Sequence, residues 1–222
     1  MNTVSTKTKV AIIGLGNIGK AVAANLIRGK HSVILASRDN EKTKELAGQL
    51  GKLAFVNEIT DAIKEADVII PAIYFSALKE FFQTYFKELE GKIIVDVSNP
   101  IAPDGNGGFK KIIGENESAG KILSALIPNN AKLIKAFGTL GAGTLINAAF
   151  NEPEYNVLFY ASDSTNSNQQ IEELITHSGF APFNIGGIDQ SIKIEVFGDL
   201  HEFGKLGKTV TLEEVKKTIA HD

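Results

Sequence analysis

The stretch from Lys9 to Arg28 reads KVAIIGLGNIGKAVAANLIR, and it decides the fold. Its first part, Lys9 to Gly14, is a short run of apolar, largely β-branched residues of the kind found in buried strands. From Ile18 to Arg28, apolar residues recur at helical spacing. Three glycines lie between and within these two parts in a G-x-G-x-x-G pattern. The stretch therefore predicts a strand, a tight glycine turn and a helix in direct succession.

The same alternation of short apolar strands and amphipathic helices continues along the chain. Continuous apolar strands separated by helices indicate a parallel sheet that is covered on both faces. We therefore predict an α/β fold with a doubly wound, mainly parallel sheet. Further strands are expected at residues 31–36, 53–56, 68–73, 92–97 and 132–137, with helices at 40–50, 58–65, 76–89 and 118–126.

After residue 138 the pattern loosens, so we divide the chain into a Rossmann-type domain at 1–138 and a small C-terminal α/β lobe at 139–222. Two strands, at 156–161 and 180–185, are expected there, and they either extend the sheet or belong to the lobe. Thr211-Leu-Glu-Glu214 is a capping box that predicts a final helix. The remaining expected elements are helices at 144–150 and 164–177 and a turn-rich loop at 103–108.

The composition excludes several classes of function. The chain has 222 residues, 23 Lys and Arg against 26 Asp and Glu, and no Cys. Without a block of positive charge it is not expected to bind nucleic acid or an anionic membrane. The missing Cys excludes disulfides, thiolate metal sites and thiol nucleophiles. Asn17 and Lys20 interrupt the first apolar run, and no run is long enough to span a bilayer, so we expect a soluble cytoplasmic protein.

The three glycines form a fingerprint for a dinucleotide. Gly14 allows the tight turn, Gly16 lets a pyrophosphate approach the backbone, and Gly19 lets helix and strand pack closely. The phosphates would lie at the positive N-terminus of the helix. The alternative is a tight turn that binds no ligand.

The end of the second strand favours NADP over NAD. NAD sites place an acidic residue there to bind the ribose hydroxyls, whereas this chain has Ser37 and Arg38. A serine can donate a hydrogen bond to a 2′-phosphate, and a guanidinium can pair with it. Lys42 can add a second positive charge. Alternatively, Asp39 pairs with Arg38, which would leave the specificity open.

Several motifs in the same order resemble the NADPH-dependent reductases of the deazaflavin coenzyme F420, and also the cytosolic domain of the STEAP metalloreductases. The resemblance covers residues 9–185 and implies a homodimer that binds NADP(H), with F420, a flavin or another small molecule as acceptor. The motifs are GLGNIGKAVAANL at 14–26, Ser37-Arg38 with Lys42, DVII at 67–70, GKIIVDVSNP at 91–100 and LIPNNAKLIKAF at 126–137.

The resemblance also implies which residues form the site. Two places at the nicotinamide side depart from the family pattern: Gly138-Thr139 replaces Asn-Thr, and Ile73-Tyr74 replaces Val-Pro, so the acceptor is the open question. Alternatively, Phe137 is only a residue of the hydrophobic core, and Asn99-Pro100 is only a turn after a strand. The pocket residues implied are Ile73, Asn99, Pro100, Phe137 and Thr139, and the cofactor-binding residues are Gly14, Leu15, Gly16, Asn17, Ile18, Gly19, Ser37, Arg38, Lys42, Ala72, Ile73 and Asn99.

Hydride transfer between two stacked rings needs position and exclusion of water more than acid or base groups. We therefore expect no catalytic side chain. His177 suits a helix C-terminus, and His201 has no metal-ligand spacing, so no metal is expected. The glutamate pairs at 172–173 and 213–214 are interpreted as solvated helix faces. Glu195 has no evident role.

The leading hypothesis is an NADPH-dependent oxidoreductase that transfers hydride between NADP(H) and a flavin-like or deazaflavin ring, or a small molecule in its place. The first alternative is a non-catalytic module that senses NADP(H). The second is a hydroxyacid or imine reductase, but such enzymes carry a long helical second domain, for which residues 139–222 leave little room.

Overall fold

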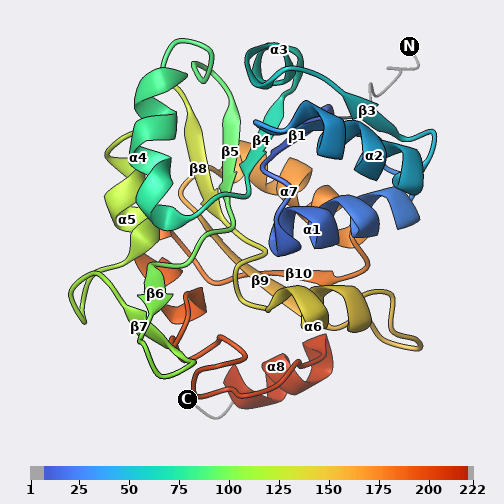
Figure 1. The fold of residues 1–222 in the computed structure, drawn as a ribbon. Coiled ribbons are helices and arrows are strands. Elements are labelled where there is room, and N and C mark those ends of the chain that lie inside the picture. The colour runs from blue at the N-terminus through green and yellow to red at the C-terminus, as the bar shows by residue number, and fades with distance from the viewer. Residues whose placement is uncertain (1–7, 220–222) are drawn as a thin grey trace.

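The computed structural model describes residues 8–219 and places an eight-stranded sheet between two layers of helices (Figure 1). The spatial order is β10-β9-β8-β5-β4-β1-β2-β3. Neighbours are parallel except β8 and β9, which are antiparallel. The predicted doubly wound α/β fold is therefore confirmed. The strands are β1 (Val10–Ile13), β2 (Val33–Ala36), β3 (Ala54–Val56), β4 (Val68–Pro71), β5 (Ile93–Asp96), β8 (Lys132–Lys135), β9 (Val157–Ser162) and β10 (Ala181–Asn184).

Helices cover both faces of the sheet because its central strands are apolar on both sides. Every residue of β1, β2, β4 and β5 is buried. One core cluster lies under α1, α2, α6 and α7, and a second lies under α3, α4 and α5. The helices are α1 (Asn17–Arg28), α2 (Asn40–Leu50), α3 (Ile59–Glu65), α4 (Phe75–Thr84), α5 (Ala119–Ser124), α6 (Ala142–Asn147), α7 (Thr165–His177), α8 (Leu212–Ile219) and the 3-10 helix η1 (Ile188–Ile194).

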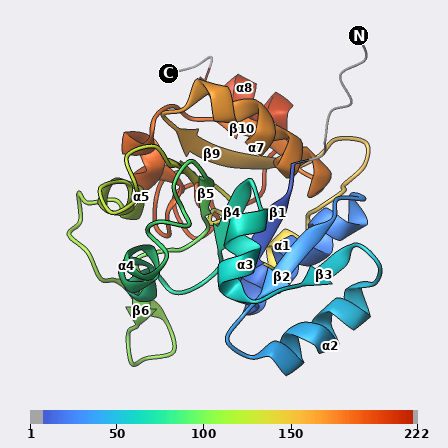
Figure 2. The ribbon, with the colours of Figure 1, turned by 90° about the horizontal axis from the view of Figure 1, so that it is seen from above.

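The C-terminal strands extend the main sheet. Figure 2 shows β9 and β10 at one end of it and β3 at the other. Within the described residues 8–219, the part after residue 138 therefore builds no sheet of its own. The proposed boundary between residues 1–138 and 139–222 stays a prediction, since the two parts share hydrogen bonds between β8 and β9.

Local differences from the sequence-based prediction lie outside the main sheet. The predicted loop at 103–108 is the tip of a hairpin formed by β6 (Ile101–Pro103) and β7 (Phe109–Lys111). Helix α4 ends at Thr84 instead of residue 89. The capping box is confirmed, because Thr211 N donates to Glu214 Oε2 at 2.8 Å and Glu214 N to Thr211 Oγ1 at 3.4 Å.

The strand order places the switch point of the sheet between β1 and β4, where the direction of chain progression reverses. In open α/β sheets, ligands bind outside the carboxyl ends of the strands at such a point. The loop that leaves β1 there contains the three fingerprint glycines. None of the helices in residues 8–219 combines the length and the apolar character that crossing a bilayer requires.

Candidate dinucleotide site

The turn between β1 and α1 needs glycine at two of its three fingerprint positions. Gly14 has φ +95°, and a Cβ there would lie 2.7 Å from Ala72 O and 2.8 Å from Ile73 Cγ2. A Cβ on Gly19 would lie 2.1 Å from Gly14 O. All three distances are too short for a real side chain, so Gly14 and Gly19 let α1 start directly against the ends of β1 and β4.

Gly16 differs, because a Cβ there would meet nothing within 4 Å. It is the N-cap of the twelve-residue helix α1, and no side chain caps that helix end. Leu15 and Ile18 pack against the core on either side, while Asn17 is exposed. The open glycine and the uncapped helix N-terminus fit a pyrophosphate, which would accept hydrogen bonds from the free N–H groups.

Ser37, Arg38 and Lys42 lie together at the carboxyl end of β2. Ser37 Oγ lies 2.8 Å from Thr43 Oγ1 and accepts from Asp39 N at 3.2 Å, which fixes the turn into α2. Arg38 is exposed, and its guanidinium makes no hydrogen bond or ion pair with any described residue. It is available for a 2′-phosphate.

Asp39 pairs with Lys42 and not with Arg38. Its Oδ2 lies 2.9 Å from Lys42 Nζ, and its Oδ1 accepts from Lys42 N at 3.1 Å. The hydrogen bond from Lys42 lowers the pKa of the Asp39 carboxyl, and the same bond raises the pKa of Lys42. Asp39 therefore partly neutralises the positive charge of Lys42. At the carboxyl end of β2, the positive charge of Arg38 has no such acidic partner among the described residues.

The opposite end of the site is expected where β4, β5 and β8 end. Ala72 and Ile73 follow β4, are half-buried and lie beside the glycine turn, since both approach Gly14. Tyr74 is 85% exposed at the N-cap of α4. Pro100 is buried directly after Asn99.

The amide of Asn99 is already used by the protein. Its Nδ2 donates to Gly138 O at 2.8 Å, and its Oδ1 accepts from Val196 N at 2.8 Å. Asn99 therefore joins the chain after β5 to the chain after β8 and to the C-terminal segment. Contact between Asn99 and the nicotinamide stays a prediction, and it falls to the backbone of Asn99 because both ends of the side-chain amide are already hydrogen-bonded.

Phe137 and Thr139 are less accessible than the resemblance implies. Phe137 is fully buried in the core, as its alternative role states. Its φ of +61° is left-handed and costs about 1–3 kcal/mol for a non-glycine residue. Thr139 is 2% exposed and lines a cavity of about 10 Å³ against Leu200 and Val210. In this conformation both side chains face the protein interior.

A buried ion pair lies where β5 and β8 end side by side. Asp96 and Lys135 are register partners, and Lys135 Nζ lies 2.7 Å from Asp96 Oδ2. Both side chains are fully buried. Lys135 also donates to Ser98 O, and Ser98 N donates to Asp96 Oδ1 at 2.8 Å. The two strand ends are thus tied together by charged hydrogen bonds.

The C-terminal segment 195–203 supplies buried polar contacts that the sequence did not reveal. Glu195 is buried, and its carboxylate accepts from Ala119 N at 2.9 Å and Gly120 N at 3.1 Å, which caps α5. His201 Nε2 lies 3.0 Å from Gly138 O, and its Nδ1 accepts from Phe203 N at 3.0 Å. Apart from Phe203, these partners are 63 or more residues away in sequence, so no local pattern signals them.

The other ionisable candidates are structural or exposed. The rings of His31 and His177 pack with centroids 5.1 Å apart, and His221 lies outside the described residues. Glu213 and Glu214 pair with Lys217 and Lys208 on the surface. Tyr160 OH donates to Glu172, so that glutamate is not simply solvated. No group of three potential metal ligands occurs between residues 8 and 219.

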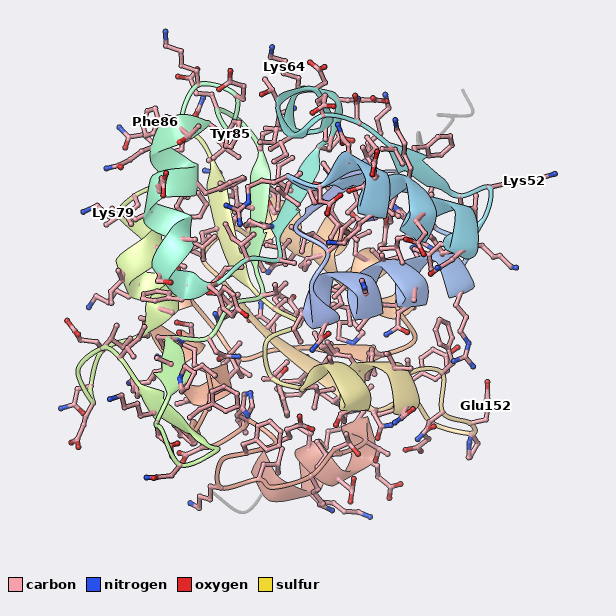
Figure 3. All side chains as sticks on the ribbon, in the orientation of Figure 1. Lys52, Lys64, Lys79, Tyr85, Phe86 and Glu152 are labelled. Atoms are coloured by element: carbon pink, nitrogen blue, oxygen red, sulfur yellow. The ribbon has the colours of Figure 1, made fainter. Side chains whose placement is uncertain are left out.

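A surface pocket lies away from the glycine turn. Its volume is about 330 Å³, and Lys64, Lys87, Glu88 and Lys92 line it. Figure 3 shows Lys64 near the end of α3 and Tyr85 near the end of α4, at the edge of the sheet opposite the glycine turn. There, Lys92 Nζ donates hydrogen bonds to Lys64 O at 3.0 Å and to Ala66 O at 2.6 Å.

The fold and the glycine turn define a dinucleotide-binding protein of the Rossmann class. Within that class, residues 9–100 match the family model for NADP oxidoreductase, coenzyme F420-dependent. This part of the chain is therefore similar to the F420-dependent NADP oxidoreductases, and the resemblance predicted from its motifs is confirmed.

Individual relatives agree with this placement. The chain is 27% identical to the metalloreductase STEAP3 of Rattus norvegicus over 190 residues, which cover 84% of this chain and 36% of that one. It is 24% identical to the F420-dependent NADP reductase of Methanothermobacter thermautotrophicus, with 84% of both chains covered. A hypothetical protein of Sinorhizobium meliloti has a similar structure, with a TM-score of 0.79, 29% identity and coverage of 92% and 95%. The chain thus spans about a third of the STEAP relative.

Proposed function

We propose that the protein is an NADP-dependent oxidoreductase that transfers hydride between NADP(H) and a flavin-like or deazaflavin ring, or a small molecule in its place. The observation that carries the proposal is that an open glycine turn occurs together with Arg38, whose guanidinium has no ionic partner among the described residues. The names of the reductase relatives support the same cofactor and F420 as one acceptor.

Each part of the site has a distinct task in this proposal. The uncapped N-terminus of α1 binds the pyrophosphate, and Arg38 binds the 2′-phosphate. The loops after β4, β5 and β8 hold the nicotinamide end. In the reductive direction, a hydride leaves NADPH with both electrons, NADP⁺ remains, and solvent supplies any proton that the reduced acceptor needs. The protein contributes orientation and shielding from water.

Turnover with a panel of acceptors tests this function. The purified protein is incubated with NADPH and, in separate reactions, with F420, FMN, FAD or a quinone, and the loss of NADPH absorbance is followed. We expect oxidation with at least one ring acceptor and slower oxidation of NADH. Tight NADPH binding without turnover on any acceptor would contradict the enzymatic proposal and favour an NADP(H)-sensing module.

A further inference from the structure

The loop that follows β8, residues 136–141, adopts a conformation that its own sequence does not favour. Phe137 has φ +61°, in the left-handed region that bulky residues avoid. At the next residue, Gly138, a Cβ would lie 3.0 Å from Val97 O, so the loop packs tightly against the chain after β5. Something outside the loop must hold it there.

Two side chains from distant parts of the chain converge on one carbonyl of this loop. Gly138 O accepts from Asn99 Nδ2 at 2.8 Å and lies 3.0 Å from His201 Nε2. Because His201 Nδ1 accepts from Phe203 N, the proton of the neutral ring is on Nε2, which therefore donates to Gly138 O. Both lone pairs of that oxygen are thus used, and we call this arrangement the Gly138 clamp.

The segment around His201 fixes the rest of the same loop. Glu202 N donates to Thr139 O at 3.2 Å, and the Glu202 carboxylate accepts from Gly141 N. Asn99 is held in turn by Val196 N at 2.8 Å. The loop after β8 therefore takes its shape from residues 99 and 196–203, and not from its neighbours in sequence.

We propose that Asn99 and His201 are positioning residues for the nicotinamide end of NADP(H), and that they act by holding the Gly138 peptide. The inference rests on the proposed function, which places the nicotinamide at the ends of β4, β5 and β8. Neither side chain needs to touch the cofactor. Their task is to keep a strained loop in one conformation at the wall of the hydride-transfer site.

The test separates the two ends of the cofactor. Affinities for NADPH and for adenosine 2′,5′-bisphosphate, which lacks the nicotinamide, are measured by calorimetry for the wild type, His201→Ala, His201→Gln and Asn99→Asp. His201→Ala and Asn99→Asp each remove one donor to Gly138 O, and we expect NADPH affinity to fall about tenfold with bisphosphate affinity unchanged. His201→Gln restores a donor and should recover most of the loss.

The matched control is Asn151→Asp, which adds the same charge at an exposed position after α6, and both of its affinities should equal those of the wild type. The inference is overturned if the clamp variants weaken both ligands equally, because that indicates general destabilisation, or if they weaken neither. Failure of the proposed function looks different, since the wild type itself would then oxidise NADPH with none of the acceptors or would bind NADPH no better than NADH.

Discussion

The loops after β1 and β8 lie at the same edge of one sheet, yet they obtain their shapes in opposite ways. The loop after β1 is shaped by its own glycines: Gly14 supplies a left-handed residue and Gly19 a close approach, within six positions. The loop after β8 contains the left-handed Phe137 and is held by Asn99 and His201, which are 39 and 63 residues from Gly138 in sequence.

The difference teaches where each half of the site is vulnerable. A loop shaped by glycines is disturbed by adding atoms to it, because space is what the glycines provide. A loop shaped by remote donors is disturbed by removing atoms elsewhere, because the strain of Phe137 is then no longer opposed. Substitutions in the two regions should therefore have different signatures.

Breaking the buried ion pair beneath the loop after β8 should cost the most. Lys135→Met leaves Asp96 charged, fully buried and without its cation, which typically destabilises by about 3–5 kcal/mol. Urea unfolding measures the loss. In the double variant Lys135→Met with Asp96→Asn, the neutral amide still accepts from Ser98 N, and part of the stability should return. A double variant no more stable than the single one would contradict this account of the pair.

At the loop after β1, the expected loss comes from an added methyl group. Gly19→Ala places Cβ 2.1 Å from Gly14 O, and the overlap with backbone should cost about 2–3 kcal/mol of unfolding free energy. Gly16→Ala is the matched control, since its Cβ meets nothing within 4 Å. That variant should keep its stability and lose affinity for NADPH. Equal destabilisation by both substitutions would show that close packing is not the reason for Gly19.

The same difference between the two loops decides which parts of the site could be predicted from the sequence alone. The apolar strand runs predicted the sheet, and the glycine spacing predicted the turn, because both depend on residues that are close in sequence. Asn99 appeared in a recognisable motif, but its role as a link between Gly138 and Val196 did not. Glu195 and His201 carried no signal, since their partners at residues 119–120 and 138 are brought near only by the complete fold.

Charge reversal at the 2′-phosphate end affects binding without touching either loop. Arg38→Glu removes the unpaired cation and adds repulsion, so NADPH should bind about thirtyfold more weakly, or about 2 kcal/mol. NADH lacks the 2′-phosphate and should lose little affinity. Lys42→Ala is a useful comparison, because Lys42 is already paired with Asp39 at 2.9 Å, and its effect should be smaller. An unchanged NADPH affinity in Arg38→Glu would show that the phosphate is bound elsewhere.

The smallest effect concerns pH and again distinguishes the two loops. Burial lowers the pKa of His201 below its usual value near 6.5, although the carbonyl of Gly138 and the charge of Glu202 act in the opposite direction. The unfolded state therefore binds more protons, so this contribution is complete above about pH 6.5 and is lost as the pH falls toward the folded-state pKa. Protonated Nδ1 can no longer accept from Phe203 N. Thermal unfolding between neutral and mildly acidic pH should show a loss of stability that His201→Gln reduces, whereas Gly16→Ala, in the loop after β1, should retain the full wild-type pH dependence.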